Sequence, residues 1–148
     1  MSKYILLIVS VVALNAQGHF TVYPQNDLVV SEFGISAQIS IRMDSLPSAE
    51  VQLPLTLSDD TEAILSANLL TFSMANWQIV QVIKVTGIPD QISDGDQVFQ
   101  LNLGVVSSED PNYNAMDLPD LNIININTDP PGIALKPASG LRVLESGS

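Results

Sequence analysis

The sequence contains no cysteine, one histidine and only five basic residues. The lack of cysteine excludes thiol catalysis, zinc-thiolate sites and disulfide bonds. A secreted domain of about 130 residues can still bury an adequate core without disulfides, so secretion is not excluded.

The single histidine, His19, leaves little room for catalysis. A Ser-His-Asp triad would have to use His19, and no G-x-S-x-G segment is present. Cleavage after Gly18 would make His19 the mature N-terminus, where it could bind copper as in oxidative polysaccharide-cleaving enzymes. That copper site, the copper brace, also needs a second histidine, and the sequence contains none. The acidic residues fall in turn sequences without flanking aromatic residues that would bind a sugar. We therefore expect that this protein is not an enzyme.

Basic residues are scarce while acidic ones are abundant, which gives a net charge of −11. Such a negative field repels nucleic acid and anionic membranes, and neither is expected as a partner. The field is compatible with divalent cations, although surface acids can equally serve to keep an extracellular protein soluble.

The first 18 residues are typical of a secretory signal. Lys3 supplies a positive start, residues 4–14 are apolar, and residues 16–18 offer small side chains for cleavage. An N-terminal membrane anchor is the alternative, but a bilayer span needs about 20 apolar residues. No second apolar segment of spanning length follows, so we expect a secreted or cell-surface protein without membrane insertion of the mature chain.

The rest of the sequence predicts short strands separated by turn residues, with no helical period. The expected strands are 21–23, 28–30, 35–43, 51–57, 69–72, 78–85, 98–105 and 121–127. Their alternation predicts the following inward residues: Ile35, Ala37, Ile39, Ile41, Met43, Val51, Leu53, Leu55, Leu57, Phe99, Leu101, Leu103 and Val105. This pattern indicates an all-β, immunoglobulin-like sandwich of about seven to eight antiparallel strands.

Three local features refine this prediction. Pro54 cannot donate to a ladder and suggests an edge strand or a bulge. The apolar phase shifts between Ile123 and Ile124, which suggests a bulge or burial on both faces. Trp77, the only tryptophan, is expected to cap one end of the core.

The end of the sequence repeats its beginning at an offset of 113 residues, about the size of one β-sandwich. Residues 19–34 and 132–147 share five identical positions, which are Pro24/Pro137, Leu28/Leu141, Val30/Val143, Glu32/Glu145 and Gly34/Gly147. We therefore expect a signal peptide at 1–18, a β-sandwich repeat at 19–129, and at 130–148 a junction with the first strand of a truncated second repeat. A fragment of a longer tandem array is an equally compatible reading.

Five segments together resemble Calx-beta-like and related immunoglobulin-like repeats of large surface proteins. They are VVSEFG (29–34), LLTFSMANWQIVQVIKVTGIPD (69–90), SDGDQVF (93–99), SSEDPNYN (107–114) and NINTDPPGI (125–133). The resemblance implies an adhesive or spacer module whose partners are neighbouring repeats or other extracellular proteins.

In Calx-beta domains, acidic residues from several loops meet at one pole and bind calcium. The resemblance therefore implies Ca²⁺ as the one possible cofactor, held by candidates at six positions: Glu32, Asp59, Asp60, Asp90, Asp94 and Asp129. This sequence departs from the family's acidic runs at Gln91, at Gln97 and at Pro130–Pro131. The alternative is that Asp90, Asp94 and Asp96 only cap a turn in which Gly95 supplies a positive φ.

A rival function is a ligand-binding module for a glycan or a protein. It would use the polar loop 107–119, where Tyr113, Asn112, Asn114 and Asp117 offer hydrogen bonds.

Overall fold

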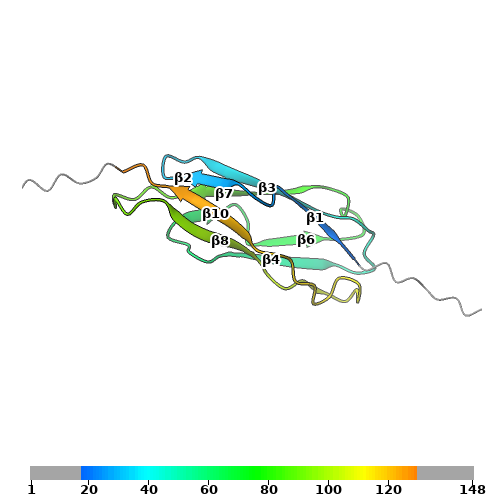
Figure 1. Cartoon of the computed structure of the whole chain (residues 1–148). Helices are drawn as coiled ribbons and strands as arrows, with labels where there is room; N and C mark the ends of the chain where they lie inside the picture. Colours follow the sequence, from blue (N-terminus) through cyan, green and yellow to red (C-terminus); the bar gives the residue numbers. More distant parts are fainter. Residues whose placement is uncertain (1–17, 130–148) are drawn as a thin grey trace, which may run out of the picture.

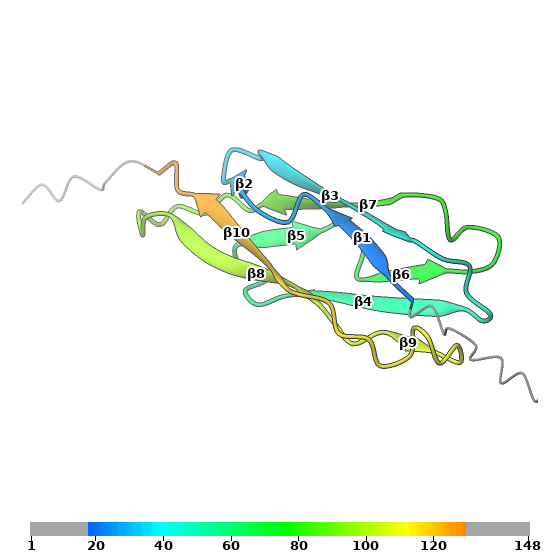
Figure 2. The same cartoon turned by 45° about the vertical axis from the view of Figure 1, so that its right-hand side comes forward.

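The computed structural model describes residues 18–129, which form two β-sheets packed face to face (Figures 1 and 2). The ten strands are β1 (Phe20–Tyr23), β2 (Leu28–Ser31), β3 (Ser36–Met43), β4 (Val51–Leu57), β5 (Ala63–Leu65), β6 (Leu69–Phe72), β7 (Gln81–Gly87), β8 (Gln97–Leu103), β9 (Ser107–Ser108) and β10 (Leu121–Ile126). The predicted signal segment before Gly18 and the predicted junction and second repeat at 130–148 lie outside the described residues. In the described part, no helix is long and apolar enough to cross a membrane.

The all-β sandwich is confirmed, with more strands than expected. One sheet has the order β1-β3-β7-β5, and the other has the order β2-β10-β8-β4-β6, with β9 paired to β4. The additional strands, β5 and β9, are only three and two residues long. Strands this short show no alternation that the sequence could reveal.

The core lies between the sheets and includes ten of the thirteen predicted inward residues. Ala37, Ile39, Ile41 and Met43 of β3 are all buried, as are Phe99, Leu101 and Leu103 of β8. Each large apolar side chain contributes roughly 1.5–3 kcal/mol when it is fully buried. Ile35 is an exception: it precedes β3 and is exposed, so its predicted inward position is wrong. Leu57 and Trp77 are partly buried against the core.

The predicted break between strands 21–23 and 28–30 is confirmed, and the structure places the two parts in different sheets. β1 pairs antiparallel with β3, and β2 pairs parallel with β10. The parallel pair corrects the expectation of purely antiparallel strands. It arises because the chain crosses between sheets at residues 24–27 and keeps its direction, so that β2 and β10 run the same way. Asp27 allows this crossing with φ of 57°.

A bulge lies opposite Pro54, in the segment that follows β8. It changes which residues of that segment face inward. Leu55 pairs with Leu103 and Gln52 pairs with Ser107, so residues 104–106 stand opposite the two residues 53 and 54. The extra residue reverses the alternation. Val106 is therefore buried and Val105 is exposed, which corrects the predicted inward position of Val105. Pro54 lies in an inner strand next to this bulge, so only the bulge alternative holds.

Two further expectations need correction. β10 pairs with β8 in one unbroken register from Leu121 to Asn125, so β10 contains no bulge. Ile124 is 40% exposed while Asn125 is buried, which excludes burial on both faces. β7 starts at Gln81, three residues later than predicted, because a turn extends through Ile79, whose N–H donates to the carbonyl of Asn76.

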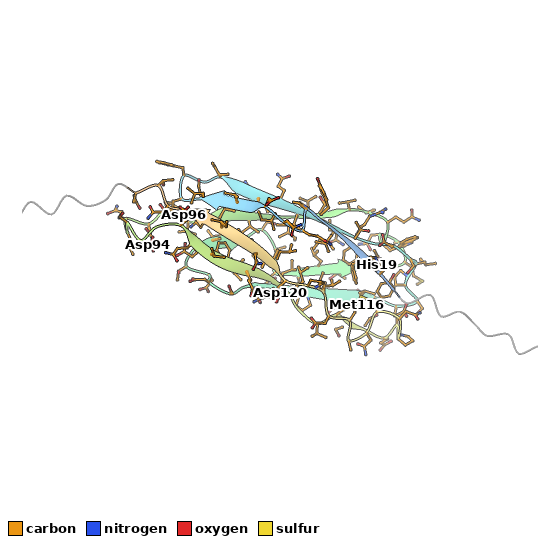
Figure 3. The ribbon with its side chains drawn as sticks, in the orientation of Figure 1. His19, Asp94, Asp96, Met116 and Asp120 are labelled. Atoms are coloured by element: carbon orange, nitrogen blue, oxygen red, sulfur yellow. The ribbon has the colours of Figure 1, made fainter. Side chains whose placement is uncertain are left out.

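The sandwich is elongated, and the described chain enters and leaves at opposite ends (Figure 1). We call the end that holds His19 and Met116 the entry pole, and the end that holds Asp94 and Asp96 the exit pole (Figure 3).

Candidate functional site

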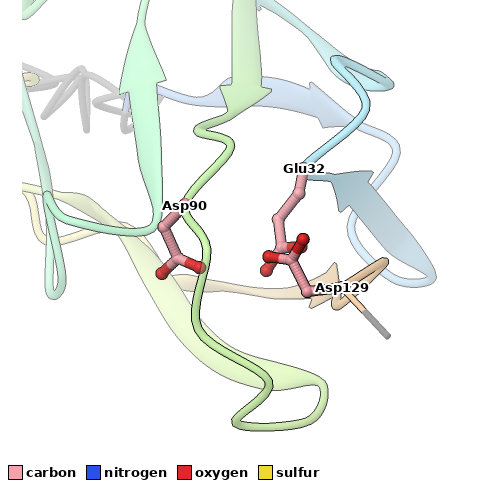
Figure 4. A group of neighbouring side chains, drawn as sticks. All are labelled: Glu32, Asp90 and Asp129. Carbon is pink, nitrogen blue, oxygen red and sulfur yellow. The ribbon is translucent and has the colours of Figure 1, made fainter. Parts of the chain in front are cut away.

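Three carboxylates converge at the exit pole. Glu32 follows β2, Asp90 lies in the loop after β7, and Asp129 lies just beyond β10 (Figure 4). One carboxylate oxygen from each lies within 4.8 Å of the other two. Topology explains the meeting, because β2 and β10 are parallel neighbours and end together, and β7 runs in the same direction in the facing sheet.

Hydrogen bonds orient the side chains of Glu32 and Asp90 and hold the backbone of Asp129. The N–H and the hydroxyl of Thr128 both donate to Oε2 of Glu32, at 2.9 and 3.2 Å. The N–H of Ile92 donates to Oδ1 of Asp90 at 2.8 Å. The N–H of Asp129 donates to Oδ1 of Asn127 at 2.7 Å, which holds the backbone that carries the third carboxylate.

Asp129 is electrostatically disfavoured in this position. Its Oδ2 is buried and has no hydrogen-bond partner. Burial raises the pKa of Asp129, and the negative charges of Glu32, Asp90 and Asp94 raise this pKa further. Such a group carries a cost when ionised that a bound cation would offset.

This raised pKa predicts an unusual dependence of stability on pH. In the folded protein Asp129 binds its proton more tightly than in the unfolded chain, so stability falls as pH rises through the folded pKa. In the presence of chelator, Asp129→Asn should therefore be more stable than wild type at pH 7. We expect this advantage to shrink as the pH is lowered toward 3.8, measured by thermal unfolding at several pH values.

Asp59 should affect the pH dependence of stability in the opposite direction and serves as a control. The hydroxyl and the N–H of Thr61 lower the pKa of Asp59, so its contribution to stability is present at neutral pH and is lost on acidification. If the stability difference between Asp129→Asn and wild type did not change with pH, a raised pKa of Asp129 would be contradicted.

The loop at residues 88–96 is held by Asn127 of the exit segment. The N–H of Asn127 donates to Oδ1 of Asp96, and its amide donates to Oδ1 of Asp94 and to the carbonyl of Ile92. Gly95 has φ of 84°, so the predicted positive φ is confirmed. Asp90 thus makes the local capping contact expected of a turn former, whereas Asp94 and Asp96 accept hydrogen bonds from Asn127. Asp90 also faces Glu32 and Asp129.

The remaining predicted ligands are not part of the three-residue group in the described chain. Asp59 accepts hydrogen bonds within its own turn, from the N–H and hydroxyl of Thr61. Asp60 follows it in the same β4–β5 connection. Asp94 lies near enough to influence Asp129 but outside the group of mutually close oxygens.

Sequence reasoning missed a buried polar contact between β10 and the β4–β5 connection. The amide of Asn125, which is 2% exposed, donates to the carbonyl of Glu62 and to its Oε2. The same carbonyl accepts the N–H of Ile88, which ties the β4–β5 connection to the loop carrying Asp90. Asn125 lies two residues after Ile123 and four after Leu121, so it continues the inward phase of β10, and this phase was the available sign that Asn125 points inward.

In the alternative ligand site predicted in loop 107–119, the central residue is buried and cannot contact a ligand. Tyr113 is 1% exposed, packs edge-to-face on Phe20, and donates its hydroxyl proton to the carbonyl of Ser45. Its predicted role in contacting a ligand is therefore wrong. Asn112, Asn114 and Asp117 of the same loop are exposed.

The two facing sheets and their strand order define the class of fold as a Calx-beta-like, immunoglobulin-like sandwich. Several solved structures share this fold. The apo-form Calx CBD1 domain is 17% identical over 76% of this chain and 98% of its own length, with a TM-score of 0.54. The calcium binding domain CBD12 of CALX1.1 is 15% identical over 75% of this chain and 46% of its own, with a TM-score of 0.55.

The similarity extends to a bacterial assembly. The CsuC–CsuE chaperone–tip adhesion subunit complex from Csu pili of Acinetobacter baumannii is 9% identical over 74% of this chain and 52% of its own, with a TM-score of 0.52. At these identities the likeness establishes the fold alone. No family model matches the sequence, and no curated protein matches it.

Proposed function

We propose that this protein is an extracellular structural or adhesive β-sandwich module whose exit pole binds one Ca²⁺ through Glu32, Asp90 and Asp129. The observation that carries the proposal is the buried, unpartnered Oδ2 of Asp129 beside two other carboxylates. The signal-like residues 1–18 and the acidic composition support the extracellular location. No catalytic role is proposed.

The three side chains fit a calcium ion in distance and in chemistry. Calcium–oxygen distances are about 2.3–2.6 Å, so two oxygens on one ion lie at most about 5 Å apart. The oxygens of Glu32, Asp90 and Asp129 all lie within 4.8 Å of one another. Calcium takes 6–8 oxygen ligands, so water or other protein oxygens would complete the coordination. Solved structures with this fold include a calcium binding domain of CALX1.1, which agrees with the proposal.

Calcium at this position would stiffen the connection to whatever follows the sandwich. Asp129 is the last described residue and is followed in sequence by Pro130 and Pro131. An ion that joins Asp129 to Glu32 and Asp90 would fix the direction in which the chain leaves. Neighbouring repeats or other extracellular proteins are the proposed partners.

The test is thermal unfolding of residues 19–148 in chelator and then in calcium. Ligand that binds only the folded state stabilises it by RT ln(1 + [L]/Kd), about 1.4 kcal/mol at tenfold excess over Kd. We expect wild type to gain several degrees in Tm. Asp129→Asn should begin with a higher Tm in chelator, because one repelling charge is gone, and should gain nothing from calcium.

Asp117→Asn is the matched control, since it removes one exposed carboxylate from the 107–119 loop. It should retain the full response to calcium. If wild type shows no rise in Tm at millimolar calcium, or if Asp117→Asn loses the rise as Asp129→Asn does, the calcium site is rejected.

A further inference from the structure

We propose that the free edge of β5 is a docking site for an extended segment of another protein, in which alternating apolar side chains are followed by lysine or arginine. β5 is an edge strand, because within the described chain it pairs only with β7. A groove of about 480 Å³ lies along this edge, lined by residues of β5 on one side and of β4 on the other. The proposal specifies a kind of partner for the module and does not rest on calcium binding.

The backbone of β5 directs four polar groups away from its only partner strand. The N–H of Ser66 donates to the carbonyl of Lys84, so these two residues form a hydrogen-bonded pair. Hydrogen-bonded pairs alternate along an antiparallel ladder, so the backbone of Ile64 faces β7, whereas the backbones of Ala63 and Leu65 face away from it. The N–H and C=O groups of these last two residues can therefore pair with an added strand.

The other wall of the groove is the second half of β4. β6 pairs with β4 only from Val51 to Pro54, so β4 continues beyond the end of this pairing. In the continuation, Leu55 is 1% exposed and Leu57 is partly buried against the core. Ala63, on the opposite wall, is 2% exposed. The groove thus has an apolar floor at the margin of the core, and apolar side chains of a docked strand would extend that core.

Pairing with β5 fixes which side chains of the docked strand enter the groove. In an antiparallel pair, residues directly opposite each other present their side chains on the same face. The residues opposite Leu65 and Ala63 would point inward, and the residue between them would point outward beside Ile64, which is 60% exposed. Because Ala63 is small, the position opposite it takes a larger apolar side chain. The expected pattern is apolar, polar, large apolar.

The charge around the groove favours a basic end on the docked strand. Asp60 lines the groove before the start of β5, and Asp59 and Glu62 lie in the same β4–β5 connection. Among the described residues that line the groove, none is basic. An antiparallel strand passes Leu65 first and reaches Asp60 last, so its lysine or arginine follows the apolar residues. Such electrostatic complementarity fixes the direction of docking as well as favouring it.

The test uses the isotopically labelled mature chain, residues 19–148, titrated with the acetylated and amidated peptide SVTLTKK and observed by NMR. The valine and leucine of this peptide are placed opposite Leu65 and Ala63. We expect the amide resonances of both residues to shift and their exchange with solvent to slow. The matched control SVTLTEE differs only in its acidic end and should bind about tenfold more weakly.

Two N-methylated forms of SVTLTKK test whether the backbone pairs with β5. A methyl group on the leucine nitrogen removes the hydrogen bond to the carbonyl of Ala63, so affinity should fall about tenfold. A methyl group on the nitrogen of the preceding threonine, whose N–H faces away from β5, should change affinity by less than about twofold. Asp60→Asn should weaken binding about threefold, whereas Asp117→Asn, which removes an exposed acid from another loop, should not weaken it.

The proposal is overturned if SVTLTKK shifts no amide of β5, if SVTLTEE binds as tightly, or if the two N-methylated peptides bind equally well. Shifts confined to β1, which is also an edge strand, would place the docking site on the other side of the sandwich and would equally reject it. The peptide comparisons need no variant of the protein. The response of Tm to calcium is measured separately, so failure of one proposal is distinguishable from failure of the other.

Discussion

Replacing Tyr113 by alanine should lower the free energy of unfolding by about 3–5 kcal/mol, the usual cost of removing a large buried aromatic side chain. Tyr113 is 1% exposed and stacks edge-to-face on Phe20, with ring centroids 5.6 Å apart. Its ring also covers Gly18, where the chain enters the domain. The loss of the ring would therefore open the entry pole as well as create a cavity, and urea unfolding measures the effect.

Tyr113→Phe is the matched control, because it keeps the ring and removes only the hydroxyl. That hydroxyl donates to the carbonyl of Ser45 at 2.8 Å, so we expect a smaller loss of about 1 kcal/mol. The pair also decides between two functions for loop 107–119. If Tyr113→Ala left stability unchanged and abolished binding of a glycan or protein, the packing role assigned here would be refuted.

Gly87→Ala should destabilise the exit pole by about 3 kcal/mol, at the upper end of the usual cost of overpacking. A Cβ at Gly87 would lie 2.4 Å from the carbonyl oxygen of Ser31 and 2.9 Å from Oδ1 of Asn125. The first contact is with backbone, which cannot rotate away. Relief requires β2 or β7 to shift, and Glu32 follows Ser31 directly. We therefore expect a weaker thermal response to calcium in addition to a lower Tm.

Gly34→Ala serves as the comparison for a purely conformational cost. Gly34 has φ of 84°, but nothing lies within 4 Å of its would-be Cβ. The expected loss is about 1 kcal/mol, from backbone strain alone. If Gly87→Ala proved no more destabilising than Gly34→Ala, the close approach of β7 to Ser31 would not be a constraint on the fold.

Most of the fold prediction came from the alternation of apolar and polar residues along the strands. In β3 and β8 the inward residues alternate without interruption, and burial follows that pattern from Ala37 to Met43 and from Phe99 to Leu103. The prediction failed at Val105, because the bulge opposite Pro54 depends on the partner strand. Periodicity within a single strand contains no information about an extra residue across the ladder.

The candidate site was predictable only in part, for a similar reason. Resemblance suggested six acidic positions, and the structure groups Glu32, Asp90 and Asp129 while leaving Asp59 in a local turn. Which acids meet depends on where loops from two sheets end in space. The buried contact between Asn125 and Glu62 joins residues 63 positions apart, and nothing in either local sequence specifies it.

The sequence by itself determined the class of fold, the inward faces of the long strands, the break in the opening strand and the positive φ of Gly95, because these depend on neighbours along the chain. Tertiary structure decided the parallel pairing of β2 with β10, the burial of Tyr113 and the meeting of three carboxylates at the exit pole. Each of these joins segments distant in sequence. Their proximity follows from how two twisted sheets stack and which strand ends they bring together, so it exists only once the chain has folded.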